Sequence, residues 1–239
     1  MSTLILQQPK RLFFGPGCVS GIADELKASS LNRVFVVTNT GAPAEMAEAQ
    51  VSLWKSQGME VEVFDGIDKE PNLALFNDTL DAVRAFSPDA VVGIGGGSAM
   101  DVAKLVAALW NGSQSVQDVF GIGLLKGRKT YLACIPTTAG TGADVSPNSI
   151  ILDEAEKLKK GVVSPYLVPD ASFVDPELTL GLPPSITAAT GYDALVHCME
   201  AYANKFAHPV VDAIALEGIR QIGLSLERAV EDGSDLEAR

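Results

Sequence analysis

The stretch that decides the fold is Ala90-Val91-Val92-Gly93-Ile94-Gly95-Gly96-Gly97-Ser98-Ala99-Met100-Asp101. Its apolar first half predicts a buried strand, and the chain then passes through glycines directly into a helical pattern. Glycines let the backbone approach a ligand without Cβ clashes, and the unbonded amides at the start of a helix attract anionic oxygens. The stretch therefore predicts a strand, a phosphate-binding loop and a helix, in that order.

Two observations keep another interpretation of this loop open. Its spacing matches neither G-x-G-x-x-G nor G-x-x-x-x-G-K-[ST]. In addition, Ser98-x-x-Asp101 fits an acidic capping box, in which the serine side chain would cap the helix and no ligand would be needed to explain either residue.

The same alternation of strands and helices continues on both sides of the loop. Strands are predicted at the apolar runs 33–38, 61–64, 90–95 and 131–136, and helices at 43–57, 73–86 and 98–110. Crossovers of this length make neighbouring strands parallel. Two later runs, 149–152 and 171–175, would add strands or an edge hairpin. We therefore expect an α/β fold built on a parallel sheet.

A domain boundary is expected at Gly181-Leu182-Pro183-Pro184, because no strand pattern follows this cluster of breakers. Helices are predicted at 185–204 and 209–230, and two helices cannot close a core by themselves. The sequence thus predicts an α/β dinucleotide-binding domain over residues 1–182. Residues 183–239 would be the beginning of an all-helical, metal-binding domain that is incomplete.

Composition excludes several classes of partner. Hydrophobic residues make up 47% of the 239 residues, and 18 basic against 30 acidic side chains give a net charge of −12. Such a surface repels nucleic acid and anionic membranes, so neither is expected as a partner. No apolar stretch reaches the length of a membrane span, and the first ten residues lack a signal-peptide core. With three irregularly spaced cysteines expected as unpaired thiols, we predict a cytoplasmic protein.

A second loop of small residues, 136–144, follows the strand predicted at 131–136. Ligands of open α/β sheets bind beyond the carboxyl ends of the strands, and three of the four predicted strands end among Gly, Ser, Thr or Asn. This coincidence favours a nucleotide. Clusters of Thr and Gly also make turns without any ligand, so the loop alone leaves both interpretations open.

Asp193 and His197 are four residues apart on a predicted helix and therefore share a face. This spacing can chelate a cation, and it also fits an ordinary hydrogen-bonded pair on a helix surface. His208 would lie roughly 16 Å further along if the helix continued, so it is assigned to a helix junction.

Four motifs in this order resemble the iron-containing (group III) alcohol dehydrogenase family. The resemblance covers essentially the whole chain and includes Phe14-Gly15-Pro16-Gly17 and Pro71-Asn72. The four motifs are Gly95-Gly96-Gly97-Ser98-x-x-Asp101, Pro136-Thr137-Thr138-Ala139-Gly140-Thr141, Asp175-Pro176-Glu177-Leu178-Thr179 and Ala189-Thr190-Gly191-x-Asp193-Ala194-x-x-His197-x-x-Glu200.

The resemblance implies an enzyme that moves a hydride between a metal-bound alcohol or aldehyde and NAD or NADP, with the metal in a cleft between two domains. By this likeness Gly96, Gly97 and Ser98 would hold the pyrophosphate. Many family members carry an acidic residue just after the first strand, where Asn39 stands here, so we expect NADP to be accepted beside NAD. The remaining cofactor residues would be Asn72, Thr137, Thr138, Thr141, Thr179 and Lys159, with Lys160 as the neighbouring alternative.

The resemblance also implies that Asp193 and His197 are the first two ligands of Fe²⁺ or Zn²⁺. The family's two further histidines, expected well downstream, do not occur in the sequence, so either a longer protein has been cut or the chain is a degraded member. We assign no side chain as catalytic and expect a small-molecule alcohol or aldehyde as substrate and a homodimer as the assembly. The alternatives are a polyol or glycerol dehydrogenase of the same architecture and a nucleotide-binding module without catalysis.

Overall fold

The computed structural model describes residues 3–239, which divide into two compact units. The α/β unit consists of Gln7–Thr137 and Ala143–Asp175. The helical unit consists of Pro176–Arg239, and it also includes the short segment Thr138–Gly142 and the described residues up to Leu6. The α/β unit therefore accounts for the larger part of the chain.

The α/β unit is built on a six-stranded sheet in which all neighbouring strands are parallel. Four of the predicted strands and the later run at 171–175 are confirmed as members of this sheet, whereas the short strand β1 is absent from the sequence prediction. In spatial order the strands are β1 (Arg11–Phe14), β9 (Ala171–Val174), β6 (Tyr131–Pro136), β4 (Ala90–Gly95), β2 (Arg33–Asn39) and β3 (Glu60–Ile67).

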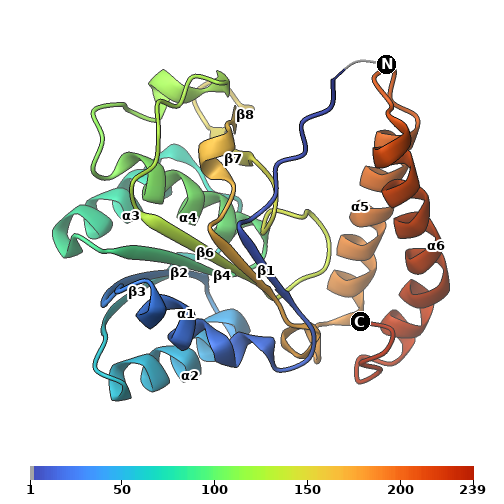
Figure 1. The fold of residues 1–239 in the computed structure, drawn as a ribbon, viewed down its shortest axis with the longest axis horizontal. Coiled ribbons are helices and arrows are strands. Elements are labelled where there is room, and N and C mark those ends of the chain that lie inside the picture. Colours follow the sequence, from blue (N-terminus) through green and yellow to red (C-terminus); the bar gives the residue numbers. More distant parts are fainter. Residues whose placement is uncertain (1–2) are drawn as a thin grey trace. The chain divides into compact units, whose positions relative to one another are not determined.

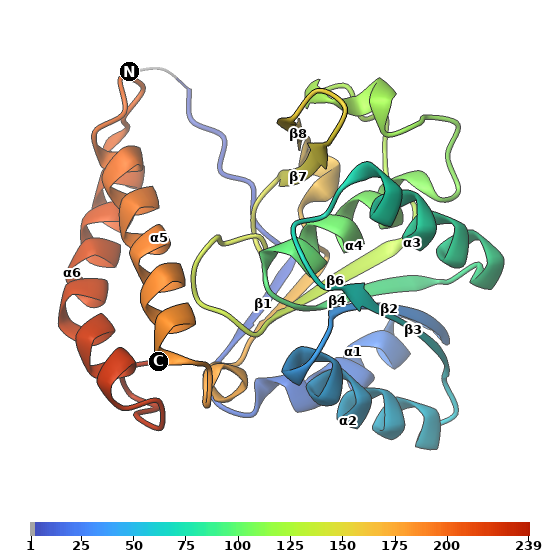
Figure 2. The same ribbon diagram turned by 180° about the vertical axis from the view of Figure 1, so that it is seen from behind.

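Helices cover both faces of this sheet, as a parallel sheet requires. Figure 1 shows α1 and α2 on one face and α3 and α4 on the other, and the view from behind in Figure 2 agrees. The three predicted helices are confirmed to within a residue or two, while α1 lies outside the prediction. The helices are α1 (Ile22–Ala28), α2 (Ala42–Ser56), α3 (Leu73–Phe86) and α4 (Gly97–Leu109).

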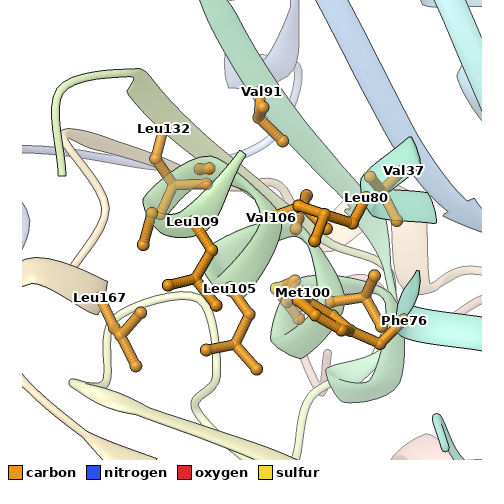
Figure 3. Packing of buried hydrophobic residues seen from close by; sticks show 14 of the residues in the cluster. Val37, Phe76, Leu80, Val91, Met100, Leu105, Val106, Leu109, Leu132 and Leu167 are labelled. Atoms are coloured by element: carbon orange, nitrogen blue, oxygen red, sulfur yellow. The ribbon is translucent and has the colours of Figure 1, made fainter. Parts of the chain in front are cut away.

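Helix α4, which follows the glycine loop, lies at the centre of the core. Ten of its thirteen residues are buried. Its side chains Met100, Leu105, Val106 and Leu109 belong to one buried cluster with side chains of α3 and of the sheet (Figure 3). The partners labelled there are Phe76 and Leu80 of α3, Val91 of β4 and Leu132 of β6. Close packing on several sides fixes the start of this helix, and with it the glycine loop.

A smaller second sheet completes the α/β unit. It consists of β5 (Gly121–Ile122), β8 (Leu158–Val163) and β7 (Asn148–Asp153), with β7 and β8 antiparallel. The predicted strand at 149–152 is β7, and it belongs to this sheet rather than to the main one. The short 3-10 helices of the chain are η1 (Cys18–Gly21), η2 (Gln117–Val119), η3 (Pro165–Leu167) and η4 (Pro176–Thr179).

The helical unit is dominated by two helices that pack against each other, α5 (Pro184–Tyr202) and α6 (Pro209–Glu231). Both confirm the helices predicted for this part of the chain. His208 caps the start of α6, where its Nδ1 accepts a hydrogen bond from the amide of Val210 (3.3 Å). Few of the side chains on these helices are buried. No helix within residues 3–239 combines the length and the apolarity that crossing a membrane demands.

Candidate functional site

The glycine loop joins β4 directly to α4. Gly96 caps the helix without any side-chain hydrogen bond, and Ser98 is already the second helical residue. The capping-box interpretation of Ser98 and Asp101 is therefore wrong, because it requires Ser98 as the N-cap residue, whereas the N-cap residue is Gly96. Asp101 instead accepts a hydrogen bond from the amide of Ile150 (3.2 Å).

The start of α4 offers unbonded amides to a ligand. Among the described residues, the backbone N–H groups of Gly97 and Ser98 have no protein acceptor. The loop is partly exposed, and the positive end of the α4 dipole reinforces the field of these donors. Two adjacent amide donors at a helix start form a site for an anionic oxygen.

The loop lies at the point where the strand order reverses. Strand β2 pairs with β3 on one side and with β4 on the other, and open α/β sheets bind ligands beyond the carboxyl ends of the strands at such a point. Asn39 is the last residue of β2. Its Oδ1 accepts from the amide of Gly96 (2.9 Å), and its Nδ2 donates to the carbonyl oxygen of Ile67 (3.2 Å).

Thr137 lies at the same edge of the sheet. Its amide donates to the carbonyl oxygen of Gly95 (2.9 Å), which places it beside the glycine loop. Its side chain is buried, and Oγ1 has no hydrogen-bond partner among the described residues. A buried hydroxyl without a partner is costly, so this atom fits a site that a polar ligand completes.

Asn72 and Lys159 already have partners within the α/β unit. Asn72 caps α3, because its Oδ1 accepts from the amide of Leu75 (2.9 Å). The Lys159 ammonium lies 2.5 Å from Glu70, and 63% of its side chain remains exposed. Lys160 is held by two carboxylates, those of Asp153 and Glu156. Lys159 is thus the less restrained of the two lysines.

Three predicted cofactor residues belong to the helical unit: Thr138, Thr141 and Thr179. The first two lie on the segment Thr138–Gly142, which packs on α5 so closely that a Cβ at Gly140 would lie 2.8 Å from Cβ of Thr190. The hydroxyl of Thr179 donates to the carbonyl oxygen of Pro176 (2.8 Å). The other seven predicted cofactor residues lie in the α/β unit.

Asp193 and His197 face each other on α5. Their closest atoms, Oδ1 and Nε2, are 3.8 Å apart, so the pair is not hydrogen bonded, and 44% and 51% of the two side chains are exposed. Oδ2 of Asp193 is buried without a partner among the described residues. Two donor atoms up to about 4 Å apart can share one ion at Zn–N and Zn–O distances near 2 Å.

The donor set around this pair is small. Within residues 3–239, no three His, Cys, Asp or Glu side chains come together in a way that could hold a metal ion. The described residues therefore fit a divalent cation with two ligands, which is fewer than the three that catalytic sites commonly use.

A buried ionic cluster under α4 is absent from the sequence prediction. Lys104 is fully buried, and its ammonium donates to the carbonyl oxygens of Ser146 (3.0 Å) and Asn148 (2.8 Å) and to the hydroxyl of Ser146 (3.2 Å). Burial lowers the pKa of Lys104 and raises the pKa of the nearby Asp101 to about 6. The sequence signal that could have indicated this cluster is a lysine within the otherwise apolar run 102–109.

The family models and the related proteins that match this chain point to the same family. Residues 9–176 match the family described as "Iron-containing alcohol dehydrogenase", and residues 187–239 match "Fe-containing alcohol dehydrogenase family, C-terminal". Alcohol dehydrogenase 4 of Schizosaccharomyces pombe is 36% identical over 232 residues, which are 97% of this chain and 55% of that protein.

Solved structures give the same picture. A 1,3-propanediol oxidoreductase superposes with a TM-score of 0.93 at 32% identity over 99% of this chain and 62% of its own. A sulfoacetaldehyde reductase from Bifidobacterium kashiwanohense, solved in complex with NAD+, has a TM-score of 0.89 at 30% identity over 100% and 63%. The chain thus spans about three fifths of the length of these relatives.

Proposed function

Because this chain belongs to the iron-containing alcohol dehydrogenase family, we propose that it is part of an enzyme that transfers a hydride between a nicotinamide cofactor and a small alcohol or aldehyde. The observation that carries the proposal is the glycine loop at the strand-order reversal, with the unbonded amides of Gly97 and Ser98 and the unpartnered hydroxyl of Thr137 beside it. The NAD+ complex of the related reductase supports the choice of ligand.

In this proposal the loop binds the pyrophosphate of the cofactor. The amides of Gly97 and Ser98 donate to phosphate oxygens, and the α4 dipole favours their negative charge. Thr137 supplies a further hydroxyl at the same edge. The chain's net charge of −12 makes such a local device necessary, since long-range attraction would act against an anionic ligand.

Both NAD and NADP are expected as cofactors. A carboxylate at the end of β2 would repel a ribose 2′-phosphate, and the chain has the neutral Asn39 there. No arginine follows Asn39 directly to bind such a phosphate, so we expect tolerance of NADP without exclusion of NAD.

Asp193 and His197 are the proposed protein ligands of a divalent metal, Fe²⁺ or Zn²⁺. When bound, such an ion lowers the pKa of an alcohol hydroxyl and polarises an aldehyde carbonyl. With two donors in place, we expect that the 239-residue protein retains no stoichiometric metal after dialysis and does not oxidise short alcohols. Metal analysis beside an NAD(P)H absorbance assay checks this, and stoichiometric metal with turnover would show that other ligands close the site.

Two further functions have support of their own. A polyol or glycerol dehydrogenase of the same architecture is one candidate, and the likeness to a 1,3-propanediol oxidoreductase favours it. A nucleotide-binding module without catalysis is the other candidate, because the glycine loop with the unbonded amides of Gly97 and Ser98 explains nucleotide binding alone. Substrate profiling separates the first from simple alcohol oxidation. The cytoplasmic location and the homodimer stay predictions.

The proposal is tested by calorimetric titration of ADP-ribose, which carries the pyrophosphate but no nicotinamide. Gly97→Val puts a branched side chain where the ligand would approach, and we expect binding to weaken roughly 30-fold or more, or about 2 kcal/mol. Gly127→Val is the matched control, because a Cβ there meets open space. Equal affinity of the Gly97 variant and the wild type would remove the loop from the site.

A further inference from the structure

We propose that Asn39 is a positioning residue whose carboxamide fixes the glycine loop, rather than a side chain that reads the ribose of the cofactor. The inference rests on the proposed function, since it assigns Asn39 its part in the same nucleotide site. Both ends of the carboxamide are already used within the protein. Oδ1 accepts from Gly96 and Nδ2 donates to Ile67, so the side chain joins the ends of three strands.

The place of Asn39 in the sheet makes this connection possible. Strand β2 lies between β3 and β4, and Asn39 ends it at the reversal of strand order. The loop after β4 lies on one side of Asn39 and the end of β3 on the other, and the carboxamide spans the two. We call Asn39, Ile67 and Gly96 the strand-end clasp.

A bulge in β3 brings Ile67 into position. Val37 of β2 pairs with Phe64 of β3, and Asn39 pairs with Ile67. The step is two residues along β2 but three residues along β3, so β3 carries one extra residue. Bulges of this kind turn a strand and redirect its groups. The carbonyl oxygen of Ile67 thereby accepts from the amide of Thr40 (3.1 Å) as well as from Nδ2 of Asn39.

Gly95 shows how closely Asn39 fits against the loop. Its φ is +148°, and an added Cβ would lie 2.4 Å from Oδ1 of Asn39 and 3.2 Å from Cβ of Ala99. A side chain at Gly95 and the Asn39 bond to Gly96 are therefore mutually exclusive. The loop keeps its path because the asparagine oxygen occupies the space beside it.

The chemistry of the clasp requires an amide. Oδ1 must accept and Nδ2 must donate, and a carboxylate of the same shape can only accept when ionised. An aspartate would place a charged oxygen against the carbonyl oxygen of Ile67. Asn39→Asp should accordingly loosen the loop, and not simply turn the site toward NAD.

The first test needs no ligand. Amide hydrogen exchange of Gly96 is measured in the wild type and in Asn39→Ala, where we expect roughly tenfold faster exchange at Gly96 with unchanged exchange in the middle of β4, since one hydrogen bond is lost locally. Asn32→Ala is the matched control at the other end of β2, because the exposed Asn32 side chain has no hydrogen bond in the described chain. Unchanged exchange at Gly96 would overturn the clasp.

The second test measures binding of ADP-ribose and of its 2′-phosphate. Asn39→Ala and Asn39→Asp should each weaken both ligands about tenfold, with the ratio of the two affinities in Asn39→Ala within about twofold of the wild type. A shift of that ratio with full binding of ADP-ribose would mean that Asn39 reads the ribose, and would overturn the inference. If the wild type binds neither ligand, the proposed function fails, while the exchange of Gly96 still decides the clasp.

Discussion

Helix α4, which follows the glycine loop, and helix α6, the last helix of the helical unit, differ sharply in the burial of their side chains. Ten of the thirteen residues of α4 are buried, but only Ala215 and Ala229 among the 23 residues of α6. The proposed nucleotide site thus rests on a complete core, whereas the proposed metal ligands lie on α5, whose only buried residue is Thr187. Regions with few buried contacts open more readily, so the two units should differ in local stability.

The exposed residues of the helical unit include many apolar side chains. Phe206, Tyr192 and Leu224 are 79%, 63% and 60% exposed. A hollow of about 470 Å³ lies between α5 and α6 and is lined by Leu195, Ile222, Leu226 and Val230 among others. An exposed apolar surface of this kind favours association with another molecule.

The largest expected difference between the units is in the loss of stability when a lysine is replaced by alanine. Lys104→Ala in α4 leaves the carbonyl groups of Ser146 and Asn148 without their donor and removes the buried cation near the carboxylates of Asp101 and Asp144, so we expect the free energy of unfolding to fall by about 4 kcal/mol. Lys205→Ala in the helical unit removes an exposed side chain and should cost less than about 0.5 kcal/mol. Urea unfolding followed by circular dichroism measures both. Similar effects of the two substitutions would contradict the difference in burial.

pH should act on the units with opposite sign. Burial raises the pKa of Asp101 from 3.8 to about 6, so the folded state binds this proton more tightly and the stability contribution of Asp101 rises as pH falls from 6 toward 4, by up to about 3 kcal/mol. Arg220 beside Glu217 lowers the pKa of that carboxyl from 4.5 to about 2, so its contribution is present above 4.5 and is lost as pH falls toward 2.

The comparison that isolates each group is wild type against Asp101→Asn and wild type against Glu217→Gln. Relative to its variant, the wild type should gain stability with acid in the first pair and lose it in the second. Urea titrations between pH 7 and pH 3 give both differences. The same sign in both pairs would show that burial does not separate the two carboxylates.

The smallest expected changes in stability come from replacing a glycine by alanine in each unit. Gly95→Ala would force a Cβ against Oδ1 of Asn39 at a φ of +148°, and we expect a loss of about 2 kcal/mol. Gly223→Ala on α6 meets open space inside a helix and should gain about 1 kcal/mol. Thermal unfolding of the two variants measures the pair. A destabilising Gly223→Ala would mean that α6 is more closely packed there than its exposure indicates.

Local patterns predicted the parts of the fold that local physics determines. The strands at 90–95 and 131–136 match β4 and β6 residue for residue, because a run of apolar side chains bounded by polar ones can only be buried as a unit. Strands β1 and β8 escaped prediction for the opposite reason. Strand β1 has only four residues. Strand β8 contains Lys159 and Lys160, and Val162 is its one buried residue, so it has no apolar run that would indicate a strand.

The sequence predicted the glycine loop and the polar strand ends, whereas the contacts of Asn39 and Lys104 could not be predicted from it; that a nucleotide binds there stays a prediction. The glycines and threonines at the strand ends indicated where a ligand would bind, since strand ends share one edge of a parallel sheet. The role of Asn39 depends on a bulge in β3 almost thirty residues away, and the path of Lys104 depends on the carbonyl groups of Ser146 and Asn148. Such long-range pairings leave no periodic trace in the sequence.

The central claim is that the glycine loop of the α/β unit binds the dinucleotide without a metal, and that the proposed metal ligands Asp193 and His197 are not needed for this binding. The most direct measurement is a calorimetric titration of ADP-ribose into the 239-residue protein after removal of metal, repeated with added Zn²⁺. We predict saturable binding at one site, with an affinity that Zn²⁺ leaves unchanged. Binding that appears only when the metal is added would contradict this claim, because the nucleotide site would then depend on Asp193 and His197.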